Sequence, residues 1–198
     1  MARPTGPGRS ALLDAGMRLI ADTTDRSLGS LSVNAIVAAA GMSKGAFFQH
    51  FPTRAHYVVE LHRTFHDEVT SRVDAATRDL PPGLKRLRRG IGAYLDACLE
   101  LRTTKAFLFH ARADVQLAQH VASRNAQFAG RATADLVTLG WADAPSVARL
   151  IVAAVAEIAL VESESGRADD RLRRAVLALV SDSERLVPGR DTPPVIGD

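Results

Sequence analysis

The sequence predicts an all-α protein of about nine helices, and its composition and hydrophobic pattern both support this fold class. Only 5% of the 198 residues are aromatic, and Val and Ile rarely alternate with polar residues, so strands are disfavoured. Apolar residues recur at helical spacing instead, starting with a helix expected from Arg9 onward that carries Leu12, Leu13, Leu19 and Ile20. With 46% hydrophobic residues, the chain suits one compact domain, or a small module joined to a larger one.

Two short helices joined by a tight turn are expected next. The segment VNAIVAAA should end at Gly41, which suits a left-handed stop, and KGAFFQHF should end before Pro52. A long helical run then extends to Leu80. The residues expected to cap these three helices are Ser32, Ser43 and Thr53. A packing helix followed by two short helices around a glycine turn is typical of a helix-turn-helix.

The rest of the chain is expected to be helical as well. After the pair Pro81 and Pro82, helical periods are expected at 84–101, 104–113, 115–139, 146–164 and 169–187. The first eight residues are rich in Pro and Gly and are expected to form a flexible arm. The tail 188–198 is expected to fray for the same reason.

Composition also excludes several classes of site and location. Cys98 is the only cysteine, so no internal disulfide and no multi-cysteine zinc motif can form. The N-terminus has no apolar signal region, and the longest apolar stretch, Leu150–Val161, is too short for a membrane span. We therefore expect a cytoplasmic protein that does not enter a membrane and holds no cofactor.

The positive charge of the chain is concentrated in its first third. Residues 1–66 carry seven Lys and Arg against four acids, whereas the remainder is balanced, so all of the net charge of +3 lies there. An anionic partner for this region is consistent with that asymmetry, although a chance surface fluctuation would produce it too.

The string LSVNAIVAAAGMSKGAFFQHFPTRAHYV resembles the DNA-binding module of the tetracycline-repressor (TetR) family of bacterial regulators. The matching elements are the cap Ser32, the Ala-rich helix with Ile36, Gly41, and the segments 43–46 and 50–54. The resemblance covers about residues 9–60, and beyond it only the all-helical layout of the family is matched. The family fold implied is an N-terminal three-helix DNA-binding domain followed by a helical domain for ligand binding and dimerisation.

The sequence departs from the family pattern at three points. Phe48 stands where Tyr is usual, which removes a hydroxyl that commonly bonds a phosphate, and Val37 stands where Ala is common. The loop between the first two helices is about three residues longer than usual. The domains implied are 1–54 (arm and DNA binding), 55–187 (effector binding and dimerisation) and 188–198 (tail).

The resemblance and the chemistry of helix starts together predict the residues that contact DNA. Helix N-termini attract phosphate, and a Gln such as Gln49 can pair with adenine in the major groove. Gly45 permits close approach of a backbone or a thymine methyl, and Arg54 is expected to clamp a phosphate. The predicted DNA-binding residues are Ser32, Asn34, Ser43, Lys44, Gly45, Ala46, Phe48, Gln49, His50, Thr53 and Arg54.

The C-terminal two-thirds holds candidates for an effector pocket. An apolar ligand pocket needs a few aromatic side chains with a polar group among them, and so does a core, so both interpretations stay open. The candidate effector-binding residues are Tyr94, Cys98, Phe107, His110 and Phe128.

Two further sets of residues have alternative interpretations. His62 and His66 have the i, i+4 spacing of a metal pair, but no third ligand is evident, and we favour a histidine pair without metal. Cys98 is either a sensor thiol or an inert buried cysteine, and the acids Asp96 and Glu100 nearby in sequence favour the inert one.

The last two helices carry more apolar surface than one small body needs. Helix 146–164 is apolar on more than one face, and a stripe including Leu179 follows helix 169–187. A homodimer through these two helices explains the excess, as it does in the family. Within the first of them, Glu157 is expected to need a partner if it is buried.

These observations predict a ligand-responsive transcriptional regulator without enzymatic activity. It is expected to be a repressor that binds palindromic double-stranded operator DNA as a homodimer and is released by a small apolar effector. The alternative is a small helical enzyme or carrier that uses a C-terminal cavity. No acid–base pair, Ser/His/Asp order or phosphate loop supports that alternative, and a gel shift would distinguish the two.

Overall fold

The computed structural model describes residues 6–22, 31–110 and 115–181, and the elements below lie within them. These residues form nine α-helices and no strand, which confirms the all-α fold class. The helices are α1 (Pro7–Asp22), α2 (Val33–Ala40), α3 (Lys44–His50), α4 (Arg54–Thr77), α5 (Leu84–Glu100), α6 (Arg102–His110), α7 (Val115–Thr138), α8 (Ala144–Ser165) and α9 (Asp170–Ser181).

Helix boundaries differ from the expected ones where proline begins a helix instead of ending one. Helix α1 begins at Pro7, so the expected arm of eight residues is partly helical. Helix α8 begins at Ala144, because Asp143 caps it by accepting the Ser146 N–H at 3.2 Å and Pro145 sits in its first turn. Proline is tolerated there because first-turn N–H groups have no intrahelical partner. The expected tail 188–198 lies outside the described residues.

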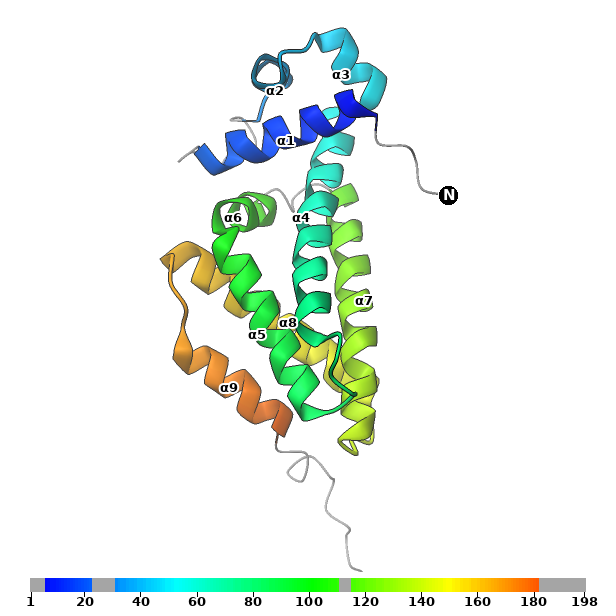
Figure 1. The fold of residues 1–198 in the computed structure, drawn as a ribbon, viewed down its shortest axis with the longest axis vertical. Coiled ribbons are helices and arrows are strands. Elements are labelled where there is room, and N and C mark those ends of the chain that lie inside the picture. The colour runs from blue at the N-terminus through cyan, green and yellow to red at the C-terminus, as the bar shows by residue number, and fades with distance from the viewer. Residues whose placement is uncertain (1–5, 23–30, 111–114, 182–198) are drawn as a thin grey trace, which may run out of the picture.

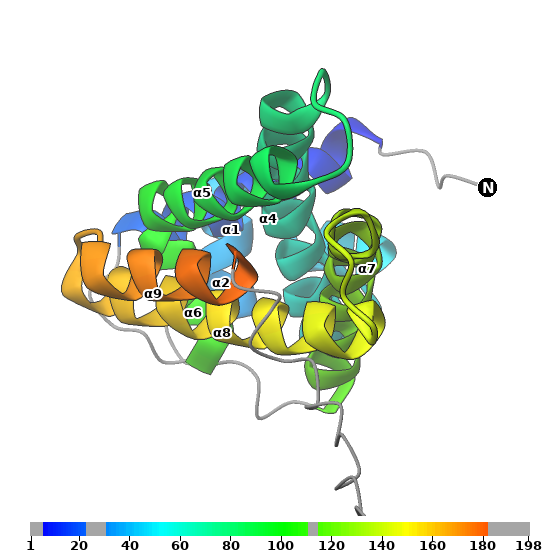
Figure 2. The ribbon, with the colours of Figure 1, turned by 90° about the horizontal axis from the view of Figure 1, so that it is seen from below.

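Helices α1, α2 and α3 form a small module at one end of the molecule, and α4 runs from this module into a larger helical body (Figure 1). Helix α7 lies alongside α4, and α8 packs against both α7 and α5. Seen from below, α9 lies next to α8 on one side of the body (Figure 2). At 24 residues, α4 is roughly 36 Å long, so it belongs to both parts.

Three rings form the centre of the N-terminal module. Tyr57, near the start of α4, packs against Phe47 and Phe51 with centroid distances of 5.3 and 4.9 Å, and all three are fully buried. Its hydroxyl donates to the Leu12 carbonyl of α1 at 2.7 Å. The ring reaches α1 at Gly16, where an added Cβ would collide with the tyrosine hydroxyl and lie 3.2 Å from Leu61. Tyr57 therefore joins α1, α3 and α4.

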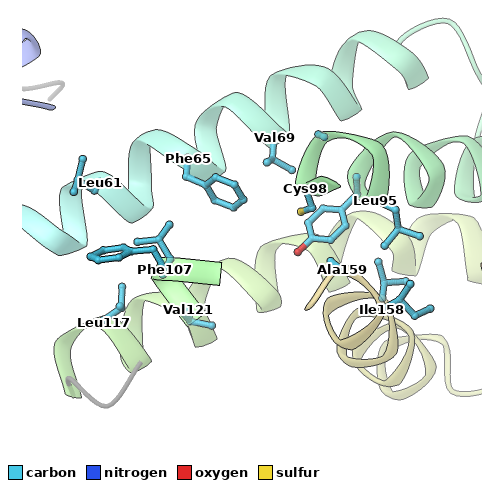
Figure 3. Close-up of a cluster of buried hydrophobic side chains, with 14 of the residues drawn as sticks. Leu61, Phe65, Val69, Leu95, Cys98, Phe107, Leu117, Val121, Ile158 and Ala159 are labelled. Atoms are coloured by element: carbon cyan, nitrogen blue, oxygen red, sulfur yellow. The ribbon is translucent and has the colours of Figure 1, made fainter. Parts of the chain in front are cut away.

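The core of the body is built around α4 and α6. Figure 3 shows Phe107 of α6 between the α4 side chains Leu61 and Phe65 and the α7 side chain Leu117, and all four are at most 1% exposed. Burial of this kind is worth about 1.5–3 kcal/mol per large apolar side chain. Phe107 is thus a central core residue.

One buried ion pair fastens α9 to the body. Glu162 of α8 is fully buried and accepts two hydrogen bonds from Arg173 of α9, each 2.7 Å, and a third from the Asp169 N–H at 2.9 Å. The same guanidinium donates to Asp96 of α5 at 2.6 Å. Glu157, for which a partner was expected only if it were buried, is exposed, and the buried acid of this helix is Glu162, five residues later.

We predict that Gly16→Ala destabilises the protein by about 1–3 kcal/mol, because the new methyl group overpacks the contact with Tyr57. Tyr57→Phe should cost about 1 kcal/mol through the lost hydrogen bond to Leu12. Because the phenylalanine variant removes the colliding atom, the double variant should lose less than the sum of the two single changes. Urea unfolding of the four proteins measures this, and strict additivity would contradict the proposed contact.

Candidate nucleic-acid interface and internal cavity

Serine and threonine hydroxyls cap the three helix starts that the sequence singled out. Ser32, Ser43 and Thr53 accept hydrogen bonds from the backbone N–H groups of Ala35, Ala46 and His56 at 3.2, 3.1 and 3.1 Å. Between the first two caps, Gly41 has φ of +67° and ends α2 in the left-handed conformation. All three hydroxyls are exposed and keep their own proton for a further acceptor such as a phosphate.

Helix α3 presents a polar and small-residue face to solvent. Lys44, Gly45, Phe48 and Gln49 are exposed, whereas Phe47 on the opposite face is fully buried. Phe48 is 51% exposed although its ring makes an edge contact with Phe47 at 5.3 Å. An exposed aromatic ring beside an amide and an ammonium group is suited to contact with a nucleic acid groove.

Gly45 leaves open space on this face. A Cβ added there would meet only the hydroxyl oxygen of Ser43, at 3.7 Å. No contact with the described residues therefore requires glycine at this position. Glycine instead lets another molecule come close to the backbone of α3.

Other predicted DNA-contacting residues are divided between the surface and the interior of the module. Asn34 is exposed in the first turn of α2, and Ala46 is half-buried. The half-buried His50 lies against α1, because a Cβ added at Gly8 would be 2.8 Å from His50 Nε2. Arg54 is half-buried, and its Nε donates to the Leu31 carbonyl at 2.8 Å, so this side chain braces the start of α2.

The sequence pattern did not point to an ion pair that holds α1 against α4. Arg9 donates to Glu60 at 2.5 Å and lies over the Phe51 ring at 5.0 Å. Burial of Glu60 opposes its ionisation, but Arg9 and Arg63 outweigh that effect and hold its pKa below the ordinary value. The pair thus fixes the position of α1 beside the exposed α3 face.

A cavity of about 550 Å³ opens between the C-terminal half of α4 and helices α5, α7 and α8. Two of the candidate effector residues line it: Tyr94 of α5 and Phe128 of α7, whose rings meet edge to face at 5.5 Å. Cys98 and Phe107 lie in the core and are not part of its lining. The side chain of His110 lies outside the described residues.

The remaining walls of the cavity carry no motif in the sequence. Gly90 of α5 and Gly130 of α7 line it with bare backbone, and Ala134 of α7 adds only a methyl group. In the sequence, these residues look like ordinary helix positions. Only the packing of the four helices gathers them around the cavity. A volume of this size falls in the range of small-molecule sites.

The geometry favours the inert interpretation of Cys98. The thiol is fully buried, and burial raises its pKa above the ordinary value. Asp96 and Glu100, the neighbouring acids, bind Arg173 and Arg72 instead of approaching the sulfur. A thiol held neutral in this way is a poor nucleophile.

A cluster of three histidines lies inside the body. His62 and His66 of α4 are buried with ring centroids 4.3 Å apart, and His120 of α7 lies 5.2 Å from His62. Burial, followed by the nearby His62 and Lys105, lowers the pKa of His66 to about 2. Within the part of the chain that the structure describes, no group of three or more His, Cys, Asp or Glu has an arrangement that could hold a metal ion.

The N-terminal module matches a known family. Residues 12–61 match the family model of bacterial regulatory proteins of the tetR family. No curated protein matches the chain at a significant level.

Solved structures with the same fold cover most of the chain. A transcriptional regulator from Rhodococcus sp. Rha1 has a TM-score of 0.74 at 22% identity, covering 92% of this chain and all of that one. A TetR-like transcriptional regulator from Rhodococcus sp. RHA1 has a TM-score of 0.71 at 17% identity, covering 94% and 100%. The TetR-like regulator LfrR from Mycobacterium smegmatis, in complex with proflavine, has a TM-score of 0.54 at 20% identity, covering 89% and 95%. At these identities the likeness establishes the fold.

We predict that His66 makes the protein acid-sensitive well above the range where most carboxylates titrate. Its folded-state pKa lies far below the unfolded value of about 6.5. Stability is therefore full above pH 6.5, and it falls as the pH drops below that value because the unfolded chain binds the proton first. The loss due to His66 should reach at most about 1.4 kcal/mol per pH unit.

Urea unfolding of the wild type and of His66→Phe at pH 7.5, 6.0 and 5.0 measures this effect. The variant should show a shallower loss of unfolding free energy than the wild type, whatever its stability at pH 7.5. If the unfolding free energies of the two proteins fell equally as the pH dropped, His66 would take up its proton as readily in the folded state as in the unfolded state, which would contradict the prediction.

Proposed function

The chain belongs to the TetR family of bacterial regulatory proteins through residues 12–61, and we propose that it is a ligand-responsive transcriptional repressor. In this proposal it binds palindromic operator DNA in the cytoplasm as a homodimer and is released by a small, largely apolar effector. Residues 1–54 act as the DNA-binding region and 55–187 as the effector-binding and dimerisation region.

The exposed face of α3 is the observation that carries the DNA-binding role. Gln49 is placed to read a base edge, and Lys44 to contact a phosphate near the helix start. The capping hydroxyls of Ser32, Ser43 and Thr53 are available to phosphates on either side. Because Arg54 is bonded to the Leu31 carbonyl, we assign it a mainly bracing role with a weaker phosphate contact.

Helix α4 is the proposed connection between effector and DNA. Its last turns carry Val73 and Thr77, which line the cavity, and its first turn carries Tyr57, which holds α1 and α3. A ligand that displaces the cavity end of α4 would therefore tilt the α3 face at the other end. LfrR, one of the structural neighbours, was solved with the small molecule proflavine bound, which supports an effector of this size class.

The face formed by α8 and α9 is the proposed dimer interface. Leu150 of α8 is 71% exposed and Leu179 of α9 is 64% exposed. Helix α8 is long and apolar enough to cross a membrane by length and composition alone, a test that core helices of soluble proteins also pass. Pairing with the same face of a second copy would cover these side chains in a four-helix arrangement.

Selection of duplexes from random DNA with the full-length chain tests the proposal. We expect a near-palindromic site whose half-sites lie about 34–36 Å apart or a multiple of that spacing, because a two-fold dimer presents two identical α3 helices. Enrichment of an asymmetric site would contradict the dimeric geometry. Enrichment of no duplex would favour the helical enzyme or carrier instead.

Leu179→Glu should convert the dimer to monomers in sedimentation and abolish binding to the selected site, because two charges would be buried in the interface. Val137→Glu is the matched control, since Val137 of α7 is 61% exposed but lies outside α8 and α9. It should leave both properties unchanged. A wild-type chain that is monomeric at micromolar concentration would contradict the interface.

Gly45→Ala should separate DNA binding from folding. The added methyl group meets no obstacle among the described residues, and alanine favours helix by up to about 1 kcal/mol, so stability should stay equal or rise. Affinity for the selected site should fall about tenfold or more, because the methyl group intrudes on the closest approach to DNA. Gly92→Ala, at an open position of α5, is the control and should affect stability alone. Unchanged affinity in Gly45→Ala would place the contact elsewhere.

A further inference from the structure

We propose that the cavity between α4, α5, α7 and α8 takes a small organic anion, with its apolar body inside and its carboxylate at the mouth near Arg78 and Arg86. This inference rests on the proposed function, in which the same cavity is the effector site. It adds the chemical class of the ligand, which follows from the charges around the cavity.

The inner wall of the cavity is apolar. The apolar lining includes Leu87 and Ile91 of α5, Phe128 of α7, and the α8 side chains Ile151 and Val155. The four aliphatic residues are buried in the hydrophobic core, so the space between them excludes charge. Such a wall suits a hydrocarbon or aromatic body.

The two carboxylates at the cavity are already satisfied by the protein. Asp135 accepts the Gly83 N–H and the Arg86 Nε–H, both at 2.8 Å. Asp74 accepts two hydrogen bonds from Arg131, at 2.5 and 3.4 Å. Each acid is therefore paired with an arginine of the lining, and the two pairs leave no excess negative charge for a cationic ligand.

The guanidinium groups are not equally satisfied. Arg78, at the end of α4, has no hydrogen bond or ion pair with any residue that the structure describes. Arg86 uses only its Nε on Asp135, which leaves its two terminal nitrogens as donors. Three arginines and two aspartates line the cavity, so its charged residues leave one net positive charge.

The hydroxyl of Tyr94, one of the lining residues, is held by a buried donor of α6. The buried Lys105 of α6 donates to the hydroxyl of Tyr94 at 3.4 Å, and Tyr94 lines the cavity. The one net positive charge of the cavity lining disfavours a cationic ligand at this site. The head of an anionic ligand is assigned to the mouth, because a guanidinium can bind a carboxylate with two parallel hydrogen bonds there.

Three probes with the same apolar body and different heads test the ligand class. Octanoate, 1-octanol and octylamine are titrated into the full-length protein by calorimetry at pH 7.5 and low salt, without DNA. We expect octanoate to bind about tenfold more tightly than octanol, as for a hydrogen bond to a charged group, and octylamine to bind most weakly. Higher salt should narrow the difference between octanoate and octanol. Equal affinities, a preference for octylamine, or no binding of any probe would overturn the proposal.

Substitutions at Arg78 locate the head group. Arg78 is exposed, so its replacement should leave the fold intact. Arg78→Ala should weaken octanoate about fivefold and leave octanol unchanged, and Arg78→Glu should reverse the order of octanoate and octylamine. Arg88→Ala is the control, because Arg88 lies on the same helix as Arg86 but binds Ser181 outside the cavity. If the Arg78 variants keep the wild-type preference, the assignment of the head group is wrong.

Adding the selected DNA duplex separates this inference from the proposed function. Arg78-dependent binding of octanoate without any effect on the DNA complex would leave the ligand class standing and overturn the regulatory role of the cavity. Release of DNA by octanol or octylamine, with no preference for octanoate, would support the regulatory role and overturn the ligand class.

Discussion

The contact of Tyr57 with α1 and α3 is the constraint on which the arrangement of the N-terminal module depends. Its ring packs on Phe47 and Phe51, while its hydroxyl reaches the Leu12 carbonyl past a glycine that leaves room for it. Since Tyr57 belongs to α4, the exposed face of α3 is oriented by the same helix that enters the body. The module therefore cannot turn independently of α4.

The interior of the body combines close packing with polar groups at a few sites. Phe107 and its neighbours on α4 and α7 form a core of almost fully buried side chains (Figure 3). The histidine cluster and Lys105 lie in the same interior, where burial keeps His66 neutral. The cavity begins beyond this core, at Tyr94 and Phe128, so a ligand there contacts the last turns of α4 and not its middle.

The outer helices of the body are α8 and α9. The ion pair of Glu162 holds α9 in place, and α8 forms part of the cavity wall. Arg173 connects α9 to both α8 and α5, so α9 is bound to the body through charge as well as through its apolar stripe. The exposed leucines on α8 and α9 are the basis of the proposed dimer interface. Because α8 also contributes Ile151 and Val155 to the cavity wall, the proposed interface and the proposed effector site share one helix.

The sequence by itself determined the features that depend on local chemistry. Ser32, Gly41, Ser43 and Thr53 mark their helix ends because capping and left-handed turns involve residues only a few positions apart. The exposed set on α3 follows from helical periodicity in the same way. Other features were decided only by the tertiary structure, because they depend on contacts between segments that lie far apart in the sequence. The bracing role of Arg54, the exposure of Glu157, the exclusion of Phe107 from the cavity and the charges at the cavity mouth each depend on how α4, α5, α7 and α8 cross, and no spacing along the chain encodes that.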